Sequence, residues 1–205
     1  MIYIHSYKDT INYVKQFYIV NRPSHDIFHA LAVFGNVEKI CKTEGIKSDI
    51  AKMAALFHDI YQIKDGQNKD VEKSASCAKD YLINVGHKAL SPQAVYNVII
   101  EADWENFQRG IKASSLDTHI LRDADWLESI GAHGIARAFS YSGEKGIPFG
   151  FKPYDSDDFS VLNHINEKLL KMKDCFHFES AKQEALKRHE FIVQFTKSLN
   201  DELTW

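Results

Sequence analysis

One segment of the chain is apolar on nearly every side and ends directly in two polar residues. Residues 50–57, with the sequence IAKMAALF, hold one lysine among seven apolar residues, and His58 and Asp59 follow at once. A helix that is apolar on almost all sides is normally buried. A buried imidazole and a buried carboxylate need compensation from hydrogen bonds or a cation. The chain must therefore fold around this segment in a way that satisfies both side chains.

Helical periodicity extends through most of the remaining sequence. Between Asp26 and about Cys41, apolar residues recur at spacings of three and four, which is the pattern of one helix face. Gly45 follows as a stop signal. Because no window shows the sustained apolar and polar alternation of a strand, the sequence predicts an all-α fold.

Capping residues mark where other helices are expected to begin and end. Ser48 precedes the apolar segment, and Ser91 precedes Pro92, so both serines are expected N-caps. Gly131 and Gly134 interrupt a longer helical pattern. The remaining expected elements are helices over residues 70–85, 116–141 and 179–203, and a loop over residues 142–157.

The length and composition fit one globular domain. The chain has 205 residues, of which 44% are hydrophobic and 26% charged, without a long linker or repeat. We therefore expect a single domain over residues 1–205, with a motif-bearing core at about 20–142 and C-terminal helices at about 158–203. The net charge of −3 argues against extended nucleic-acid binding, and apolar surface on the helices leaves room for a homodimer.

The cysteines and the N-terminal residues indicate the compartment. Cys41, Cys77 and Cys175 are an odd number without a Cys-x-x-Cys pair, so we expect free thiols. Residues 1–5 lack the basic start and apolar run of a signal peptide. No segment reaches the ~18 continuous apolar residues of a transmembrane helix. The sequence thus predicts a cytoplasmic protein that is not attached to a membrane.

Histidine and aspartate residues at four places have the chemistry of divalent-metal ligands. They are residues 24–29 (SHDIFH), the doublet His58-Asp59, residues 123–125 (DAD), and the pair His87 and His119. Imidazole nitrogen and carboxylate oxygen both bind divalent cations. The helices of a bundle can direct such residues to one point. Taken alone, each histidine also fits a surface position and each aspartate a helix cap.

These segments resemble the HD-domain family of metal-dependent phosphohydrolases, which is named for the His-Asp doublet. The matching segments are SHDIFHALAV, AALFHDI, LRDADWLESIGAHGIARAFSYSG and HINEKLLKMKDCFHFESAKQEALKRHEFI, from about residue 20 to 202. The likeness is to the small bacterial single-domain branch, whose members include manganese-dependent nucleotide pyrophosphohydrolases. The resemblance implies an HD-type helical bundle that acts on a small nucleotide-like phosphate.

The resemblance also implies a set of metal ligands, which are His29, His58, Asp59 and Asp125. Asp123 lies two residues before Asp125, about 200° around a helix, so both cannot face one ion, and the family pattern selects Asp125. One divalent ion per chain is expected, with Mn²⁺ first and Mg²⁺, Co²⁺, Fe²⁺, Ni²⁺ or Zn²⁺ as alternatives. Such an ion would lower the pKa of a bound water, which then attacks a phosphate ester or anhydride.

The expected proton-transfer group differs from the family pattern. Many members have an acidic residue three positions after the doublet, whereas this chain has Gln62, which cannot act as an acid or base. Asp65, Glu72 or Asp123 would then take that role, beside Asp59, which could orient the water as well as bind the ion. The residues expected to contact substrate are Arg22, His25, Gln62 and Arg122, with Arg137 as a further candidate cation.

Two other functions stay open. His87 and His119 would be candidate ligands of a second metal, as in HD proteins that hold two irons, a subset of which activates oxygen. The missing acid at Gln62 also fits an HD scaffold that binds a nucleotide or a protein without catalysis. A metal stoichiometry of two irons would favour the oxygenase, and one manganese-like ion the hydrolase.

Overall fold

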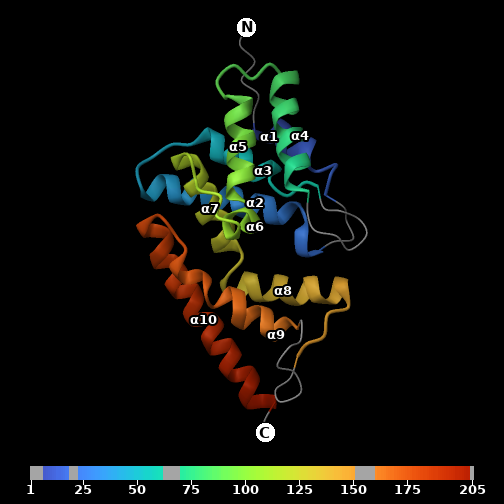
Figure 1. Cartoon of the computed structure of the whole chain (residues 1–205), viewed down its shortest axis with the longest axis vertical. Helices are drawn as coiled ribbons and strands as arrows, with labels where there is room; N and C mark the ends of the chain where they lie inside the picture. Colours follow the sequence, from blue (N-terminus) through green and yellow to red (C-terminus); the bar gives the residue numbers. More distant parts are fainter. Residues whose placement is uncertain (1–6, 19–22, 62–69, 151–159, 204–205) are drawn as a thin grey trace. The chain divides into compact units, whose positions relative to one another are not determined.

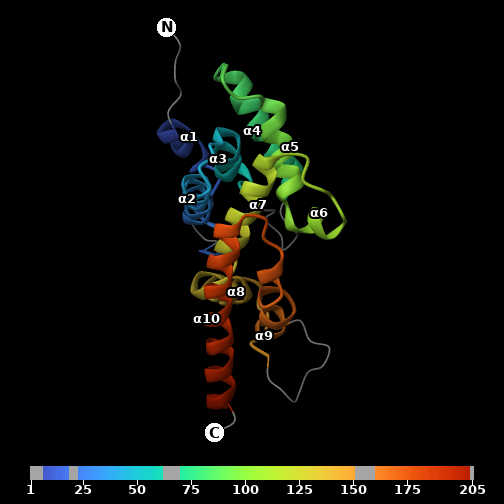
Figure 2. The same ribbon diagram turned by 90° about the vertical axis from the view of Figure 1, so that its left-hand side faces the viewer.

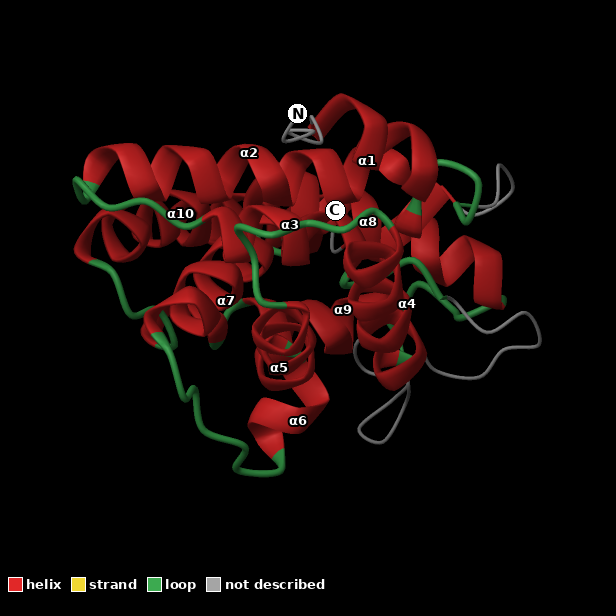
Figure 3. Cartoon of the chain, turned by 90° about the horizontal axis from the view of Figure 1, so that it is seen from above, coloured by secondary structure: helices red, strands yellow, loops and turns green. Residues whose placement is uncertain are grey.

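The computed structural model describes residues 7–18, 23–61, 70–150 and 160–203 (Figure 1). Within these ranges all regular secondary structure is helical and no strand occurs, which confirms the predicted all-α fold (Figure 3). The helices are α1 (Tyr7–Val14), α2 (Ile27–Thr43), α3 (Asp49–Phe57), α4 (Val71–Asn84), α5 (Pro92–Ala102), α6 (Trp104–Gln108), α7 (Leu116–Glu128), α8 (Gly131–Lys145), α9 (Val161–His164) and α10 (Glu179–Leu203). Shorter turns are the 3-10 helices η1 (Pro23–His25) and η3 (Met172–Asp174) and the π-helical turn η2 (Ile165–Leu169).

The two expected N-caps, and Asp26 in addition, begin three of these helices. The Ser48 hydroxyl accepts a hydrogen bond from Ala51 N at 2.8 Å at the start of α3. The Ser91 hydroxyl accepts one from Ala94 N at 3.3 Å at the start of α5. The Asp26 carboxylate caps α2 in the same way. Each cap satisfies backbone N–H groups that have no partner within the helix.

The chain divides into two compact units, Met1–Asp125 and Trp126–Trp205. In the first unit, α3 is central, because it packs against α1, α2, α4 and α5. Five of its residues are fully buried, namely Ala51, Ala54, Ala55, Leu56 and Phe57. The predicted burial of the apolar segment is therefore confirmed, and the end of this helix lies in the core of its unit. The single-domain expectation for the whole chain stays a prediction.

In the second unit, α8 packs against α10 (Figure 2). The apolar stripe of α10 is buried at Ala181, Ala185 and Ile192. The Arg188 side chain reaches back from α10 to donate to the Leu127 carbonyl. The other sides of α10 carry charged residues, so burial of this apolar stripe is what holds the helix in place.

The structure corrects some of the expected boundaries. Residues 116–141 form two helices, and the break lies at Gly131, with a φ of +76°, which is one of the two glycines expected to interrupt this pattern. Helix α8 continues through Lys145, so the expected loop begins at Gly146, where φ is +64°. The pattern had not indicated α1 or α6, which are only eight and five residues long.

Two other expectations concern the cysteines and the membrane. All three cysteines are free thiols, as predicted. Burial raises the pKa of Cys41, Cys77 and Cys175, so none is an activated thiolate at neutral pH. No described helix combines the length and the apolar character that membrane crossing requires.

Two glycines of α8 provide a matched test of the second unit. A Cβ added at Gly134 would lie 2.1 Å from the Ser129 carbonyl oxygen, whereas a Cβ at Gly143 would meet nothing within 4 Å. We expect Gly134→Ala to lower the free energy of unfolding by at least about 2 kcal/mol, because backbone must shift. We expect Gly143→Ala to raise it by about 0.5–1 kcal/mol, because alanine favours the helix. Urea unfolding measures both, and similar effects for the two variants would contradict the packing at Gly134.

Candidate metal site

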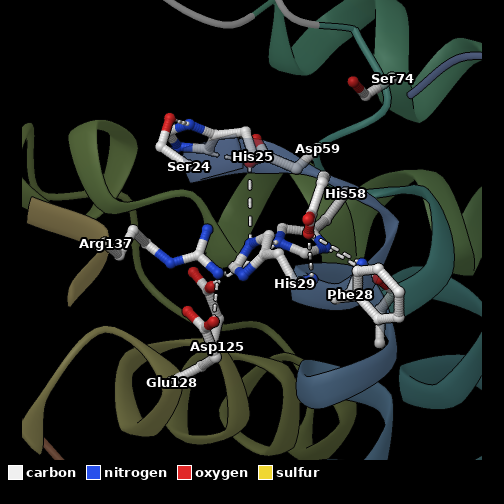
Figure 4. Close-up of polar contacts among 12 residues, drawn as sticks. Ser24, His25, Phe28, His29, His58, Asp59, Ser74, Asp125, Glu128 and Arg137 are labelled. Carbon is white, nitrogen blue, oxygen red and sulfur yellow. Dashed lines mark hydrogen bonds and ion pairs between the residues drawn. The ribbon is translucent and has the colours of Figure 1, made fainter. Parts of the chain in front are cut away.

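Three side chains from three helical segments converge on one point of the first unit (Figure 4). His29 Nε2 lies 3.0 Å from His58 Nε2. Asp125 Oδ1 lies 3.5 Å from His29 Nε2 and 3.6 Å from His58 Nε2. One donor atom from each residue falls within 4.8 Å of the others. The structure thus brings together three of the four expected ligands as a group that could hold a metal ion.

Asp59, the fourth expected ligand, lies at the edge of this group. Its Oδ2 is 3.7 Å from His29 Nε2, and the residue is 2% exposed. Two imidazole nitrogens and two carboxylate oxygens are a donor set that suits several divalent cations. The chemistry of these side chains therefore fits a divalent metal ion.

The tautomer of His58 follows from its neighbour. His58 Nδ1 lies 2.9 Å from the Ala55 carbonyl oxygen, which can only accept a hydrogen bond. Nδ1 therefore carries the proton, and in the neutral ring Nε2 presents a lone pair toward His29. A backbone carbonyl that fixes the outer nitrogen in this way orients the inner one for a metal.

Hydrogen bonds outside the group fix the helices that carry it. Asp26 Oδ1 accepts from Phe28 N at 2.9 Å and from His29 N at 3.2 Å, which sets the first turn of α2. Asn36 Nδ2 donates to the Ala124 carbonyl at 2.9 Å and ties α2 to α7 beside Asp125. The ligand-bearing segments are therefore held by bonds that involve none of the four ligand side chains.

Arg122, which was expected to contact substrate, is buried and bonds to backbone carbonyls. The residue is 5% exposed, and its guanidinium donates to the Glu101 carbonyl at 3.0 and 2.6 Å and to the Ile111 carbonyl at 2.7 Å. Burial lowers the pKa of Arg122. These bonds anchor α7 to the end of α5 and to the loop after α6. These bonds give Arg122 a part in the fold, and its contact with substrate stays a prediction.

Glu101 completes this anchor from the side of α5. Its carboxylate accepts from Ser114 N at 2.9 Å, from the Ser114 hydroxyl at 2.7 Å and from the Thr118 hydroxyl at 2.7 Å. Burial by itself raises the pKa of Glu101, but these hydrogen bonds and the nearby charge of Arg122 together lower it. The glutamate is therefore a structural anion that holds the start of α7.

His25 lies beside the ligand group, as a substrate contact should. Its Nε2 is 3.9 Å from Asp59 Oδ2, and its Nδ1 is 2.9 Å from the hydroxyl of the buried Ser24. The side chain of His25 is 26% exposed, against 5% for His29. Among these histidines, His25 is the one that a ligand could approach from solvent.

The other expected site residues differ in where they lie. Asp123 is 1% exposed on α7, and its charge acts on neighbouring Arg122. Glu72 is exposed in the first turn of α4 and is not part of the ligand group. Arg137 belongs to the second unit, where it pairs with the buried Glu128. Arg22, Gln62 and Asp65 lie outside the described residues.

One residue beside the ligand group had not been singled out in the sequence. Asp103, at the junction of α5 and α6, is 6% exposed and lines a small cavity together with His58 and Asp125. Its sequence context was a usable signal, because Asp103 directly follows the largely apolar segment VIIEA, whose one charged residue is Glu101, much as the doublet follows AALF. A buried carboxylate at the end of an apolar helix requires compensation in both places.

Comparison with known proteins agrees with this geometry. A profile of the HD domain matches residues 27–130. The uncharacterised protein YpgQ of Bacillus subtilis strain 168 is 31% identical over 180 residues, which cover 87% of this chain and 84% of YpgQ. The crystal structure of YpgQ in complex with ADP has a TM-score of 0.75 at 26% identity, with 96% of this chain and 97% of that chain covered.

Two further crystal structures share the fold. An HD-superfamily hydrolase from Bacillus thuringiensis has a TM-score of 0.70 at 28% identity, with 97% of this chain and 99% of that chain covered. A protein from Lactobacillus plantarum has a TM-score of 0.80 at 23% identity, over 100% of this chain and 99% of its own. Because the Lactobacillus plantarum protein is only 23% identical, its similarity supports the fold alone.

The ligand group predicts which substitutions abolish metal binding. We expect Asp59→Ala and His29→Ala to weaken Mn²⁺ binding at least about 100-fold, because loss of a ligand should exceed the 10–100-fold effect of outer-shell partners. Titration calorimetry on chelator-treated protein measures this, with circular dichroism as the check on folding. His87→Ala is the matched histidine control and should bind Mn²⁺ like the unaltered protein. Stoichiometric, tight binding by Asp59→Ala would remove Asp59 from the ligand set.

Proposed function

The chain belongs to the HD-domain family, and we propose that it is a metal-dependent phosphohydrolase that acts on a small nucleotide-like phosphate. The observation that carries this proposal is the convergence of His29, His58 and Asp125, with the two Nε2 atoms 3.0 Å apart. Three helical segments bring these polar side chains together in a buried place, and such an arrangement costs stability unless it serves a ligand.

Each ligand residue has a defined part in this function. His29, His58, Asp59 and Asp125 would hold the divalent ion. The Ala55 carbonyl keeps the His58 ring oriented through Nδ1, and Asp26 keeps the first turn of α2 in place. When bound, such an ion polarises a phosphate oxygen and lowers the pKa of water to near neutrality. Burial of the ligands limits water around the reacting group, which strengthens the electrostatic effects.

A nucleotide is the proposed class of substrate. The support comes from YpgQ, whose crystal structure was solved in complex with ADP. In this chain, the partly exposed His25 beside Asp59 is the described residue best placed to contact such a ligand. Arg22, which precedes this region in the sequence, is proposed as a cationic contact to phosphate.

The two alternative functions make different demands on the chain. A di-iron oxygenase would need a second set of ligands, and neither His87 nor His119 belongs to a metal-competent group among the described residues. A non-catalytic scaffold would bind nucleotide, and metal, without turnover. One divalent ion per chain together with hydrolysis would exclude both alternatives.

The proposal is tested by hydrolysis assays on chelator-treated protein. We expect Mn²⁺ to restore hydrolysis of at least one nucleoside triphosphate from a panel of ribo- and deoxyribonucleotides, with release of phosphate or pyrophosphate. His58→Ala should lower kcat/KM at least about 10³-fold, since a ligand and its orienting bond are both lost. His87→Ala should retain full activity. Nucleotide binding without any turnover in the whole panel would instead favour the scaffold.

The glutamine at position 62 predicts a preference among nucleotides. Pyrophosphate leaves readily without protonation, whereas a nucleoside alkoxide leaves poorly, and general acid catalysis contributes roughly 10²–10⁴-fold where it operates. We therefore expect kcat/KM to be higher for dATP than for dAMP. We also expect Gln62→Glu to raise the rate with dAMP more than the rate with dATP. Equal gains on both substrates would mean that Asp65, Glu72 or Asp123 already supplies the proton.

A further inference from the structure

A small cavity adjoins the ligand group on the side of α5. Its described walls come from His58 after α3, Asp103 after α5 and Asp125 on α7, and from four apolar residues, Val71, Ile99, Ala102 and Leu121. The space open to the centre of a water molecule is about 10 Å³. That is close to the least volume that holds one water, which also needs two to four polar partners.

Asp103 is the ionisable residue of these described walls that is not an expected metal ligand. It is 6% exposed, so it is as buried as His58. Its Oδ1 accepts a hydrogen bond from Asn106 N at 3.0 Å, and Asn106 Nδ2 donates to the Ile100 carbonyl at 2.9 Å. These bonds close the corner between α5 and α6 and hold the carboxylate in position. An ionised carboxylate has about four acceptor sites, so it can accept hydrogen bonds from several donors at once.

We propose that Asp103 is a positioning residue that accepts a hydrogen bond from the water that attacks phosphorus. This inference rests on the proposed function and extends it to a residue outside the metal ligands. The apolar walls at Val71, Ile99, Ala102 and Leu121 offer a water no side-chain partner. His58 and Asp125, the other polar residues of these walls, are proposed metal ligands, so a water in this cavity directs one O–H toward the Asp103 carboxylate, which leaves a lone pair on its oxygen for phosphorus. Correct orientation of a reacting water is worth orders of magnitude in rate.

Substitution by asparagine separates this role from the capping role. Asparagine caps helices as well as aspartate does, so its carbonyl oxygen can take over the bond from Asn106 N. Its amide nitrogen then occupies the place of the second oxygen and donates where the carboxylate accepted. A water held by that amide presents a lone pair to residue 103 and turns its O–H groups elsewhere. Asp103→Asn thus replaces a hydrogen-bond acceptor that faces the water with a donor, while the shape of the side chain stays nearly the same.

The first test compares the steady-state kinetics of variants at two N-cap aspartates, Asp103 and Asp70. Asp70 caps α4 through a bond from Lys73 N at 2.9 Å and does not line the cavity. We expect Asp103→Asn to lower kcat about 10²-fold with KM changed less than about threefold, because misplacement of a reacting group by about 1 Å has an effect of that size. Asp70→Asn should leave kcat unchanged, and both variants should keep Tm within about 2 °C. An unchanged kcat for Asp103→Asn would overturn the proposal.

Metal affinity distinguishes positioning from ligation. The Mn²⁺ dissociation constant of chelator-treated Asp103→Asn should stay within about threefold of the unaltered protein, since its side chain does not hold the ion. An affinity loss of about 100-fold or more, as expected for loss of a ligand, would instead place Asp103 in the ligand set and overturn the positioning role.

A crystal structure of the Mn²⁺-loaded protein tests the water without reference to activity. We expect an ordered water in the cavity within about 2.6–3.2 Å of an Asp103 carboxylate oxygen. An empty cavity, or direct Asp103 ligation of the ion, would overturn the proposal. If no nucleotide is hydrolysed, the proposed function fails, while this structure and the affinity measurement still decide whether Asp103 holds a water beside the metal ligands.

Discussion

Burial of two polar side chains at the end of the central helix is the constraint on which the first unit depends. His58 is 6% exposed and Asp59 2% exposed, directly after a helix whose last four residues are fully buried. Transfer of an imidazole and a carboxylate into such surroundings is unfavourable unless partners replace the lost water. The Ala55 carbonyl serves one nitrogen of His58, and His29 lies close to both residues of the doublet. Removal of any one partner would leave the others buried without compensation, so the ligand group belongs to the core as much as to the site.

The elements around α3 are positioned by hydrogen bonds that use none of the four expected ligand side chains, which keeps these side chains available. Asn36 holds α7 through the Ala124 carbonyl, one residue before Asp125. The Ser48 hydroxyl caps α3 and donates to Asp117 at 2.5 Å, so the start of α7 is tied to the start of α3. Arg122 fastens the middle of α7 to the end of α5. A site supported on several rigid helices in this way is preorganised, and its ligands do not need to be gathered by the ion.

The sequence revealed those features that depend on local chemistry. Ser48 and Ser91 were identified as caps because a capping side chain bonds to N–H groups only two or three residues away. The buried character of residues 50–57 was equally evident, because no amphipathic packing could accommodate apolar residues on all sides. The end of α8 was placed too early, since Gly143 fits within a helix when its position is exposed, and the helix ends only where Gly146 adopts a positive φ.

Features that depend on tertiary contacts could not be predicted in the same way. Arg122 has the sequence context of a phosphate contact, and only the packing of α5 against the loop after α6 turns its guanidinium toward two carbonyls. The sequence signals burial of Asp103 after a largely apolar segment, but only the tertiary structure makes it a wall of the same cavity as His58 and Asp125. The convergence of His29 and Asp125 required a resemblance to a family, because spacing within one helix carries no information about another helix.

Electrostatics connects the ligand group with the proposed phosphate substrate. Asp59, Asp103 and Asp125 bring three carboxylates around two histidines, and the guanidinium of Arg122 is engaged by backbone carbonyls. Without a bound cation, these carboxylates repel a phosphate in a setting where burial weakens screening by water. In a phosphohydrolase built on these residues, a bound divalent ion would offset this repulsion, so phosphate affinity should depend on that ion more strongly than on any single arginine.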